Sequence, residues 1–331
     1  MIQSVKQFIE EWESGTSFLE VHTSGSTGTP KLIRLPRKLV IDSAMRSITH
    51  FGLDGNSRVH ICLSTDHIAG KMAVVRALLS GARLTAEAPS SEPRIGSDEG
   101  PVTLLSVVAA QIPSLAAKAR AGNLPPIKHL LIGGAPLTES IAGESLGIAE
   151  YVWESYGMTE TASHIALRHI SRCGDVAEKP FTLLSGIKID LDERGCLRVF
   201  MNGEQPLVTN DIAKIHSTDT FSILGRIDNV IITGGLKVHP EHVEQILQPL
   251  LSGIGSYIIT SQPHPKWGNL IILMIESGEE LSIDNKSRLL DAAARLLPPH
   301  ERPRDIITVS ELPRTSSGKI IRRLSAPQEG A

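Results

Sequence analysis

A polar loop near the start of the chain, residues 22–31, has the composition of a phosphate-binding loop. It reads HTSGSTGTPK, so hydroxyl groups, two glycines and the Lys31 ammonium stand close together. Backbone amides, hydroxyls and one cation suit a polyphosphate, and Gly25 and Gly28 let the backbone approach a ligand closely. The loop does not match the Walker pattern G-x-x-x-x-G-K-[ST]. By itself, its composition leaves a Ser- and Gly-rich surface turn open.

The sequence YGMTE at 156–160 combines an aromatic ring, a hydroxyl and a carboxylate. Tyr156 could stack on a base, Thr159 could bond a phosphate, and Glu160 could hold Mg²⁺. Because Mg²⁺ is usually bound by one or two carboxylates together with phosphate oxygens, a single glutamate is sufficient.

The glycine pair Gly133-Gly134 follows a predicted strand at 127–132. Ligands of parallel sheets bind beyond the carboxyl ends of the strands, so a purine could lie against the backbone here. Taken alone, such a pair is more often a tight turn.

A cationic helix entrance is a candidate anion site. Residues 68–79 have helical apolar spacing, with Asp66 as the expected N-cap, His67 at the entrance and Lys71 in the first turn. A cation beside a helix N-terminus attracts an anion. The alternative, a solvated lysine and a loop histidine with ordinary partners, is at least as common.

Composition restricts the class of protein. A chain of 331 residues, 41% of them hydrophobic, can bury a large core, and a net charge of −3 gives no electrostatic reason to expect nucleic acid or an anionic membrane as the main partner. The cysteines, Cys62, Cys173 and Cys196, are odd in number and far apart, which argues against a zinc site and fits a reducing cytosol. No run reaches membrane-spanning length, and the N-terminus lacks a signal-peptide core. We expect a cytoplasmic, soluble protein without membrane insertion.

Alternating strands and helices must position these groups. The expected strands are 18–21, 32–35, 58–63, 82–86, 102–106 and 127–132, and the expected helices are 4–13, 37–51, 68–79, 107–121 and 137–146. This alternation favours βαβ units. Short strands after about 180 indicate a compact β subdomain, and strands at 254–260, 269–275 and 305–309 with helices from Pro240 and at 283–297 indicate a small α+β domain. We therefore expect an α/β fold: a parallel-sheet βα domain with an appended β subdomain, then a small α+β domain.

The stretches at 22–31 and 156–160 resemble the signatures of the adenylate-forming superfamily, which includes acyl-CoA synthetases, peptide-synthetase adenylation domains and firefly luciferase. Three later stretches extend the resemblance: VTNDIA at 208–213, GRIDNVIITGGLKVHP at 225–240 and LPRTSSGKIIRR at 312–323. Asn210 stands where the family has Gly, and Asn tolerates a left-handed backbone almost as well. Most members carry a long segment before the phosphate loop, so we expect this chain to lack an N-terminal subdomain.

The resemblance also implies roles for individual residues. Lys319 would be catalytic, together with Thr159 and Glu160, and Glu160 would be the metal ligand. Asp228 would be the hinge between an N-terminal domain, 1–227, and a mobile lid domain, 228–331. The implied CoA channel is bordered by Gly234 and Gly235. The implied ATP- or AMP-binding residues are Thr23, Ser24, Gly25, Ser26, Thr27, Gly28, Lys31, Gly133, Gly134, Ala135, Tyr156, Gly157, Asp211 and Arg226.

In the family's reaction a carboxylate attacks the α-phosphate of ATP, pyrophosphate leaves, and coenzyme A then takes the acyl group and releases AMP. Because both reactants of the first step are anions, catalysis rests mainly on positioning and electrostatic stabilisation. The resemblance thus implies ATP, Mg²⁺ and coenzyme A, with Lys319 bridging the carboxylate and the α-phosphate.

Within the superfamily, residues 66–72 and 157–164 look most like the o-succinylbenzoate–CoA ligases of menaquinone biosynthesis. Such an acid has a second carboxylate that needs its own cation, because a buried unpaired charge is unfavourable. His67 and Lys71 are the expected partners, with Ser163 and His164 lining the ring. A ligase for another aryl or acyl acid, an enzyme that loads a separate carrier protein, and a nucleotide-binding relative without catalysis stay open, as does an oligomer.

Overall fold

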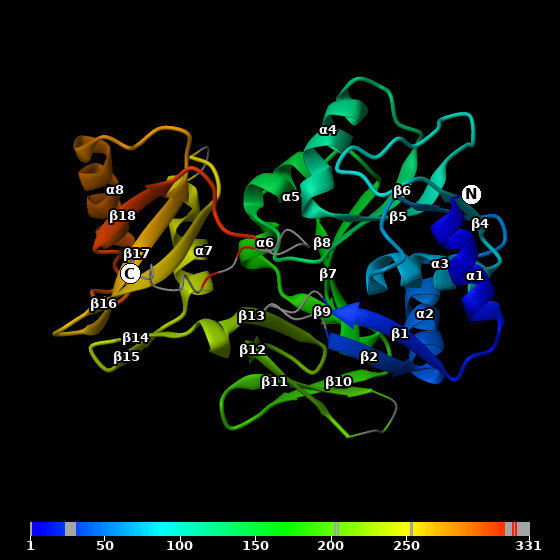
Figure 1. Cartoon of the computed structure of the whole chain (residues 1–331), viewed down its shortest axis with the longest axis horizontal. Helices are drawn as coiled ribbons and strands as arrows, with labels where there is room; N and C mark the ends of the chain where they lie inside the picture. The colour runs from blue at the N-terminus through cyan, green and yellow to red at the C-terminus, as the bar shows by residue number, and fades with distance from the viewer. Residues whose placement is uncertain are drawn as a thin grey trace, which may run out of the picture. The chain divides into compact units, whose positions relative to one another are not determined.

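The computed structural model describes residues 2–23, 31–201, 203, 205–251, 254–314, 320 and 322. The chain divides into two compact units (Figure 1). The first comprises 1–188, 200–207 and 216–221, and the second 189–199, 208–215 and 222–331. This division groups much of the β subdomain with the C-terminal part. The predicted boundary at 227/228 is the hinge about which the C-terminal domain would rotate, and it stays a prediction.

The first unit is built on a large mixed sheet. Strands β3 (Arg58–Ile61), β4 (Arg83–Ala86), β5 (Val102–Val108), β6 (Ile127–Gly133) and β7 (Tyr151–Met158) pair in parallel. Strands β8 (Ser163–Ile170) and β9 (Phe181–Leu183) extend the sheet antiparallel, giving the order β9-β8-β7-β6-β5-β3-β4. The predicted α/β class is confirmed. Its sheet becomes antiparallel after β7 because a tight turn, rather than a helical crossover, links β7 to β8.

Helices cover both faces of this sheet. Helices α2 (Arg37–Phe51) and α3 (Ile68–Ser80) pack together, as do α4 (Ile112–Arg120) and α5 (Glu139–Ser145). Neighbouring residues of β5 belong to two separate hydrophobic cores. Leu105 packs in the core on the face covered by α4 and α5, and Leu104 packs in the core on the face covered by α2 and α3. Strands buried on both faces explain the nearly continuous apolar runs of the sequence.

Two smaller elements complete the first unit. Helix α1 (Gln3–Glu13) buries Val5, Phe8 and Trp12, and it packs against α3. Strands β1 (Phe18–Thr23) and β2 (Lys31–Pro36) form an antiparallel pair. The expected strands on either side of the phosphate loop are therefore present.

Strands β10 (Ile187–Leu191), β11 (Cys196–Met201), β12 (Leu207–Ile215) and β13 (Thr220–Arg226) follow one another in hydrogen-bonding order. They are the short strands expected after residue 180. A 3₁₀ turn, Ile227–Asn229, follows β13 directly.

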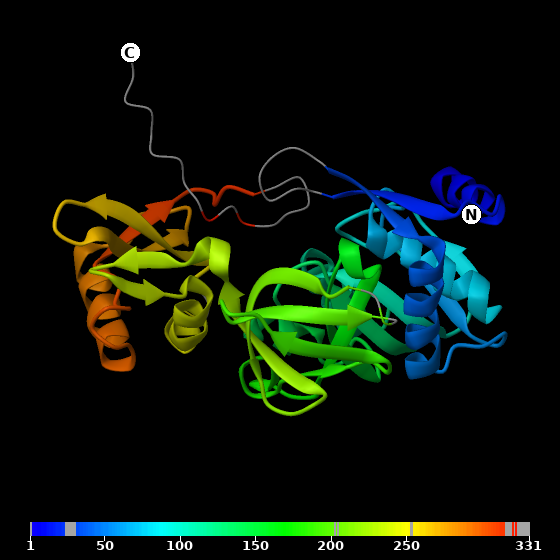
Figure 2. The ribbon, with the colours of Figure 1, turned by 90° about the horizontal axis from the view of Figure 1, so that it is seen from below.

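The remainder of the second unit is a small α+β body, as expected. Strands β16 (Tyr257–His264), β17 (Gly268–Glu276) and β18 (Asp305–Val309) form one sheet, while β14 (Ile231–Thr233) and β15 (Leu236–Val238) form a hairpin. Helices α7 (Pro240–Leu251) and α8 (Ile283–Leu296) pack together on one face of the larger sheet (Figure 2). Among the helices in the described part of the chain, none is both long and apolar enough to cross a bilayer.

Candidate active site

The two ends of the predicted phosphate loop lie side by side. Thr23, the last residue of β1, pairs in register with Lys31, the first residue of β2. Lys31 is exposed. Residues 24–30, and with them Ser24, Gly25, Ser26, Thr27 and Gly28, lie outside the described residues, as does Lys319. The phosphate-binding loop and the catalytic role of Lys319 therefore stay predictions.

The segment after β6 presents bare backbone at the carboxyl edge of the parallel sheet. A Cβ on Gly133 would lie 2.7 Å from the Ser155 hydroxyl oxygen, so the Ser155 side chain would have to shift to admit one. Gly134 has a φ of +92°, a conformation that favours glycine. Gly134 and Ala135 are exposed. A purine could lie against such exposed backbone, and this role stays a prediction.

The YGMTE sequence lies where β7 ends. Gly157 cannot carry a side chain, since its Cβ would stand 2.3 Å from the Ser163 carbonyl oxygen on β8. The half-buried Tyr156 ring packs against Phe181, with centroids 5.7 Å apart, and Phe221, at 5.3 Å. These contacts fix the orientation of the ring that is predicted to meet the base.

Thr159 and Glu160 begin the 3₁₀ turn that links β7 to β8. The Glu160 side chain is exposed at this turn. Within the described ranges, no group of three or more His, Cys, Asp or Glu residues could hold a metal by itself. A single exposed carboxylate fits Mg²⁺ that takes its other ligands from phosphate oxygens and water.

The turn ends in a strained backbone. Ala162 has a φ of 52° and Ser163 a φ of 101°, and they are the non-glycine residues with positive φ in the described part of the chain. The Ser43 hydroxyl donates to the Ala162 carbonyl over 2.8 Å, which helps to hold the turn. Such outliers persist where their surroundings over-determine them, often at functional sites.

Ser163 and His164, both predicted to line the acid pocket, meet a buried arginine from α3. Arg76 Nη2 donates to the Ser163 hydroxyl over 2.8 Å and lies 3.4 Å from His164 Nδ1. Because arginine only donates, His164 accepts at Nδ1 and carries its proton on Nε2, which faces the Ser47 hydroxyl at 3.1 Å. Burial, aided by Arg76, holds the pKa of His164 well below its usual range. His164 is therefore neutral at physiological pH.

Arg76 was not predicted from the sequence. It is 1% exposed, and burial lowers its pKa to about 10, so it remains a cation at neutral pH. Its Nε is buried without a hydrogen-bond partner, and none of the carboxylates in the described ranges forms an ion pair with it. The available sequence signal was an arginine inside the apolar run MAVVRALL at 72–79.

His67 and Lys71 occupy the predicted helix entrance. The N-cap of α3 is the exposed His67, without a side-chain cap bond, so the expectation of Asp66 as the cap is wrong. Lys71 Nζ lies 3.6 Å from the Glu11 carboxylate and 4.4 Å from the centroid of the Phe8 ring, both on α1. The Lys71 cation thus has partners in α1, whereas Arg76, further along α3, reaches Ser163 and His164.

Asp211 and Arg226 form an ion pair within the second unit. Arg226 Nη1 donates to Asp211 over 2.9 Å, and its Nη2 donates to Asp228 over 2.7 Å. Burial works against the charge of Arg226, but the two carboxylates outweigh it and raise its pKa. Asn210 lies in β12 and donates to Asp228 over 3.2 Å, so the left-handed backbone considered for it is not adopted. The structure thus brings together the predicted ribose and hinge residues.

Gly234 and Gly235 form the tight turn of the β14–β15 hairpin. Their φ values are +56° and +82°, as such hairpin turns require. The Gly234 amide donates to the Trp267 carbonyl over 2.8 Å. Turn chemistry accounts for both glycines, and the CoA channel stays a prediction.

Comparison with known proteins gives a consistent result. The family described as AMP-binding enzyme matches residues 11–195. A 2-succinylbenzoate–CoA ligase from Enterococcus faecalis is 25% identical over 93% of this chain and 69% of its own length. A Listeria monocytogenes protein of the same name is 26% identical over 95% of this chain and 70% of its own.

Solved structures agree. An acyl-CoA synthetase (AMP-forming)/AMP-acid ligase II-like protein from Dyadobacter fermentans is 30% identical, with a TM-score of 0.62 over 96% of this chain and 91% of the other. Bacillus subtilis o-succinylbenzoate CoA synthetase, solved with the acyl-adenylate OSB-AMP, shares the fold, with a TM-score of 0.74, 24% identity, and coverage of 92% of this chain and 67% of the other. Since the family match spans more than half of the 331 residues, this chain belongs to the AMP-binding enzyme family.

Proposed function

We propose that this protein is an ATP-dependent acid–CoA ligase whose acid is an aromatic dicarboxylate, o-succinylbenzoate. It would form the acyl-adenylate and pyrophosphate, then acyl-CoA and AMP. The observation that carries the choice of acid is the buried Arg76 cation, held beside Ser163 and His164 next to the turn that bears Glu160. The relatives named for this same reaction support the proposal.

The nucleotide would be held by residues already described. The bare backbone at Gly134 and Ala135 and the Tyr156 ring would contact the adenine, and Asp211 with Arg226 would bind the ribose. Mg²⁺, when bound at Glu160, would neutralise charge on the phosphates. Lys319 and the loop at 23–31 keep their predicted roles at the α-phosphate and the leaving pyrophosphate.

Arg76 suits the carboxylate that does not react. Isolating a guanidinium from water without a counter-ion is unfavourable, so a bound carboxylate would stabilise the site as well as the ligand. Arg46 on α2 adds a second positive charge that lowers the pKa of His164 further. Its Nε and Nη2 are buried and, among the described residues, have no hydrogen-bond partner. Because His164 is neutral, the positive charge of these two arginines is the charge that a bound carboxylate would balance.

The test is ATP–pyrophosphate exchange with a panel of acids, followed by addition of CoA. We expect exchange with o-succinylbenzoate, much weaker exchange with benzoate and with fatty acids, and thioester formation once CoA is present. Equal exchange with benzoate would contradict the dicarboxylate pocket. Acyl-AMP that never reaches CoA would favour a separate carrier protein, and ATP binding without exchange would favour a non-catalytic relative.

The cytosol is the compartment that we propose for this reaction. Cys62, Cys173 and Cys196 are all free thiols, as expected in a reducing environment. An oligomer is compatible with the proposal and is not required by it.

A further inference from the structure

The loop between β6 and α5, residues 134–138, is tied to β7 by a buried carboxylate. The Leu137 amide donates to Glu154 Oε1 over 3.0 Å, and Glu154 is 3% exposed. Glu154 stands two residues before Tyr156 on β7. One side chain therefore links the backbone surface proposed for adenine to the strand that carries the stacking ring.

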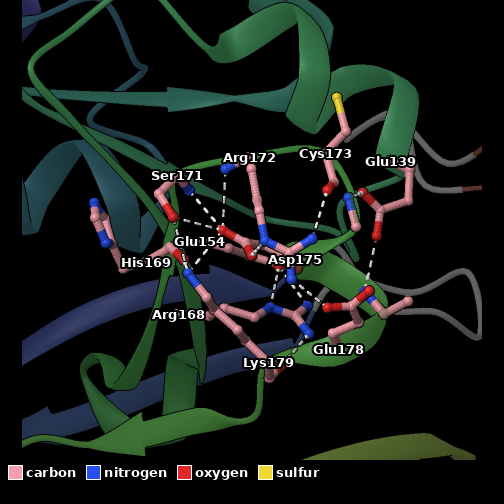
Figure 3. Close-up of polar contacts among 12 residues, drawn as sticks. Glu139, Glu154, Arg168, His169, Ser171, Arg172, Cys173, Asp175, Glu178 and Lys179 are labelled. Atoms are coloured by element: carbon pink, nitrogen blue, oxygen red, sulfur yellow. Dashed lines mark hydrogen bonds and ion pairs between the residues drawn. The ribbon is translucent and has the colours of Figure 1, made fainter.

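Arg168 on β8 completes this link (Figure 3). Its Nε and Nη2 donate to Glu154 Oε2 over 2.9 and 2.5 Å, and its Nη1 donates to the carbonyl oxygens of Val176 and Lys179. The guanidinium carbon also lies 4.3 Å from the centroid of the Phe181 ring. All three nitrogens of the fork are used, which fixes the guanidinium plane.

The contact with Phe181 leads to the other side of the adenine site. The Phe181 ring packs against Tyr156, with centroids 5.7 Å apart. Arg168 is thus linked to the loop through Glu154, and it is linked to the Tyr156 ring through Phe181. Moving its guanidinium would shift both surfaces between which the base is proposed to lie.

A second anchor holds the far end of the loop. Glu139, the first residue of α5, accepts hydrogen bonds of 2.8 Å from the amides of Gly174 and Ala177, at helix α6 (Asp175–Glu178). Asp175 holds this short helix, accepting from the Ser171 amide over 2.7 Å and from Lys179 over 2.8 Å (Figure 3). The loop is therefore fixed at Leu137 and again two residues later.

We propose that Arg168, acting through Glu154 and Phe181, is a positioning residue for recognition of the adenine base, an inference that rests on the proposed function. A buried ion pair is often no better for stability than apolar residues of the same volume. If the Arg168–Glu154 pair only fills the core, a conservative substitution of Arg168 would leave the preference for ATP over GTP unchanged. A pair that sets the distance between loop and ring would alter selectivity.

The test compares equilibrium binding of ATP and GTP, each with Mg²⁺, to the full chain by isothermal titration calorimetry. Adenine presents an amino donor where guanine presents a carbonyl acceptor, so a correctly placed backbone loop prefers ATP. Arg168→Lys keeps a positive charge beside Glu154 but loses the planar fork and its stacking on Phe181. We expect the ratio of the GTP Kd to the ATP Kd to fall about fivefold, the effect of one misaligned hydrogen bond.

The matched control is Arg198→Lys, which alters an ion pair with Asp190 outside this network and should keep the wild-type ratio. A folded Arg168→Lys protein with the wild-type ratio, or a wild type without preference for ATP, would overturn the proposal. If Arg168→Lys does not fold, Phe181→Leu, which removes the ring that lies between Arg168 and Tyr156, should lower the ratio about twofold to fivefold. An unchanged ratio in that variant would overturn the proposal equally.

The binding ratio needs no turnover and does not depend on the fraction of folded protein. Failure of the ligase proposal would appear as no exchange with any acid, while the ATP-to-GTP ratio would still report on Arg168. The two failures are therefore distinguishable.

Discussion

Replacement of Arg76 by methionine should separate the recognition of a dicarboxylate from the general chemistry of the site. The side chain is buried, bonds to Ser163 and His164, and has no carboxylate partner among the described residues. Methionine is unbranched and fills a similar path through the core. The change removes the charge and leaves the helix intact.

The expected effect on activity follows from the hydrogen bonds that Arg76 would make to a carboxylate. Hydrogen bonds to charged groups contribute about 1.5–3 kcal/mol, which corresponds to a loss of roughly 10- to 150-fold in kcat/KM. The loss should apply to o-succinylbenzoate. Benzoate has no second carboxylate, so its already weak exchange should change by less than about threefold.

The expected effect on stability has the opposite sign from most core substitutions. The pKa of Arg76 is about 10 in the folded state, below the ordinary 12.5, so folding disfavours the charged arginine by about 3 kcal/mol at neutral pH. This free-energy cost decreases only as the pH rises from 10 to 12.5. Loss of the two hydrogen bonds offsets about 2 kcal/mol of this. The variant should therefore be about 1 kcal/mol more stable, with Tm raised by roughly 2 °C.

The assays are ATP–pyrophosphate exchange with both acids and thermal unfolding without ligands. Arg58→Met is the matched control, because Arg58 is also buried but pairs with Glu99 at 3.0 Å and donates to the Gly100 carbonyl over 2.6 Å. That control should lose stability and keep its acid selectivity. Equal losses on both acids for Arg76→Met, or a fall in its Tm like that of the control, would refute the reasoning.

Three further outcomes follow from the geometry. Gly157→Ala should destabilise the fold by about 3 kcal/mol in chemical denaturation, because the added methyl would stand 2.3 Å from a backbone oxygen of β8; wild-type stability would contradict the close approach. Burial lowers the pKa of His129 to about 4, so the unfolded state gains a proton on this side chain before the folded state does. The free energy of unfolding should therefore fall by up to about 3 kcal/mol between pH 6.5 and 4. His129→Gln should reduce this fall. A thiol reagent should label the exposed Cys173 in the native protein, whereas Cys62, with a pKa raised by burial to about 12, and the buried Cys196 should react only after unfolding.

Much of the fold was predictable because its signals are local. The expected helix at 37–51 coincides with α2, and the expected strands from 58 to 132 all lie in the sheet. The antiparallel turn to β8 was not foreseen, because nothing in the apolar pattern of 163–170 shows which neighbour it pairs with. Helix α3 begins where the sequence predicts, but its N-cap is His67, one residue after the expected Asp66.

The candidate site divides in the same way. The YGMTE stretch and the glycine pair after β6 could be recognised because their residue types and spacing carry the chemistry. The place of Lys71 in the first turn of its helix predicts a cation for the acid, whereas in the structure Lys71 pairs with Glu11 on α1. Whether a charge has a counter-ion depends on elements far away in the sequence, and no local pattern reports it.

Short stretches of the chain encode the family of chemistry and the α/β class, and they also predict which residues meet the nucleotide. Only the tertiary structure brought Arg76 beside Ser163, 87 residues further along the chain, and left its charge buried without a carboxylate partner in the described ranges. It likewise joined Arg168, Glu154 and Leu137 into one network. Burial and pairing are set by the packing of distant segments, and that packing decides what a charged side chain can do.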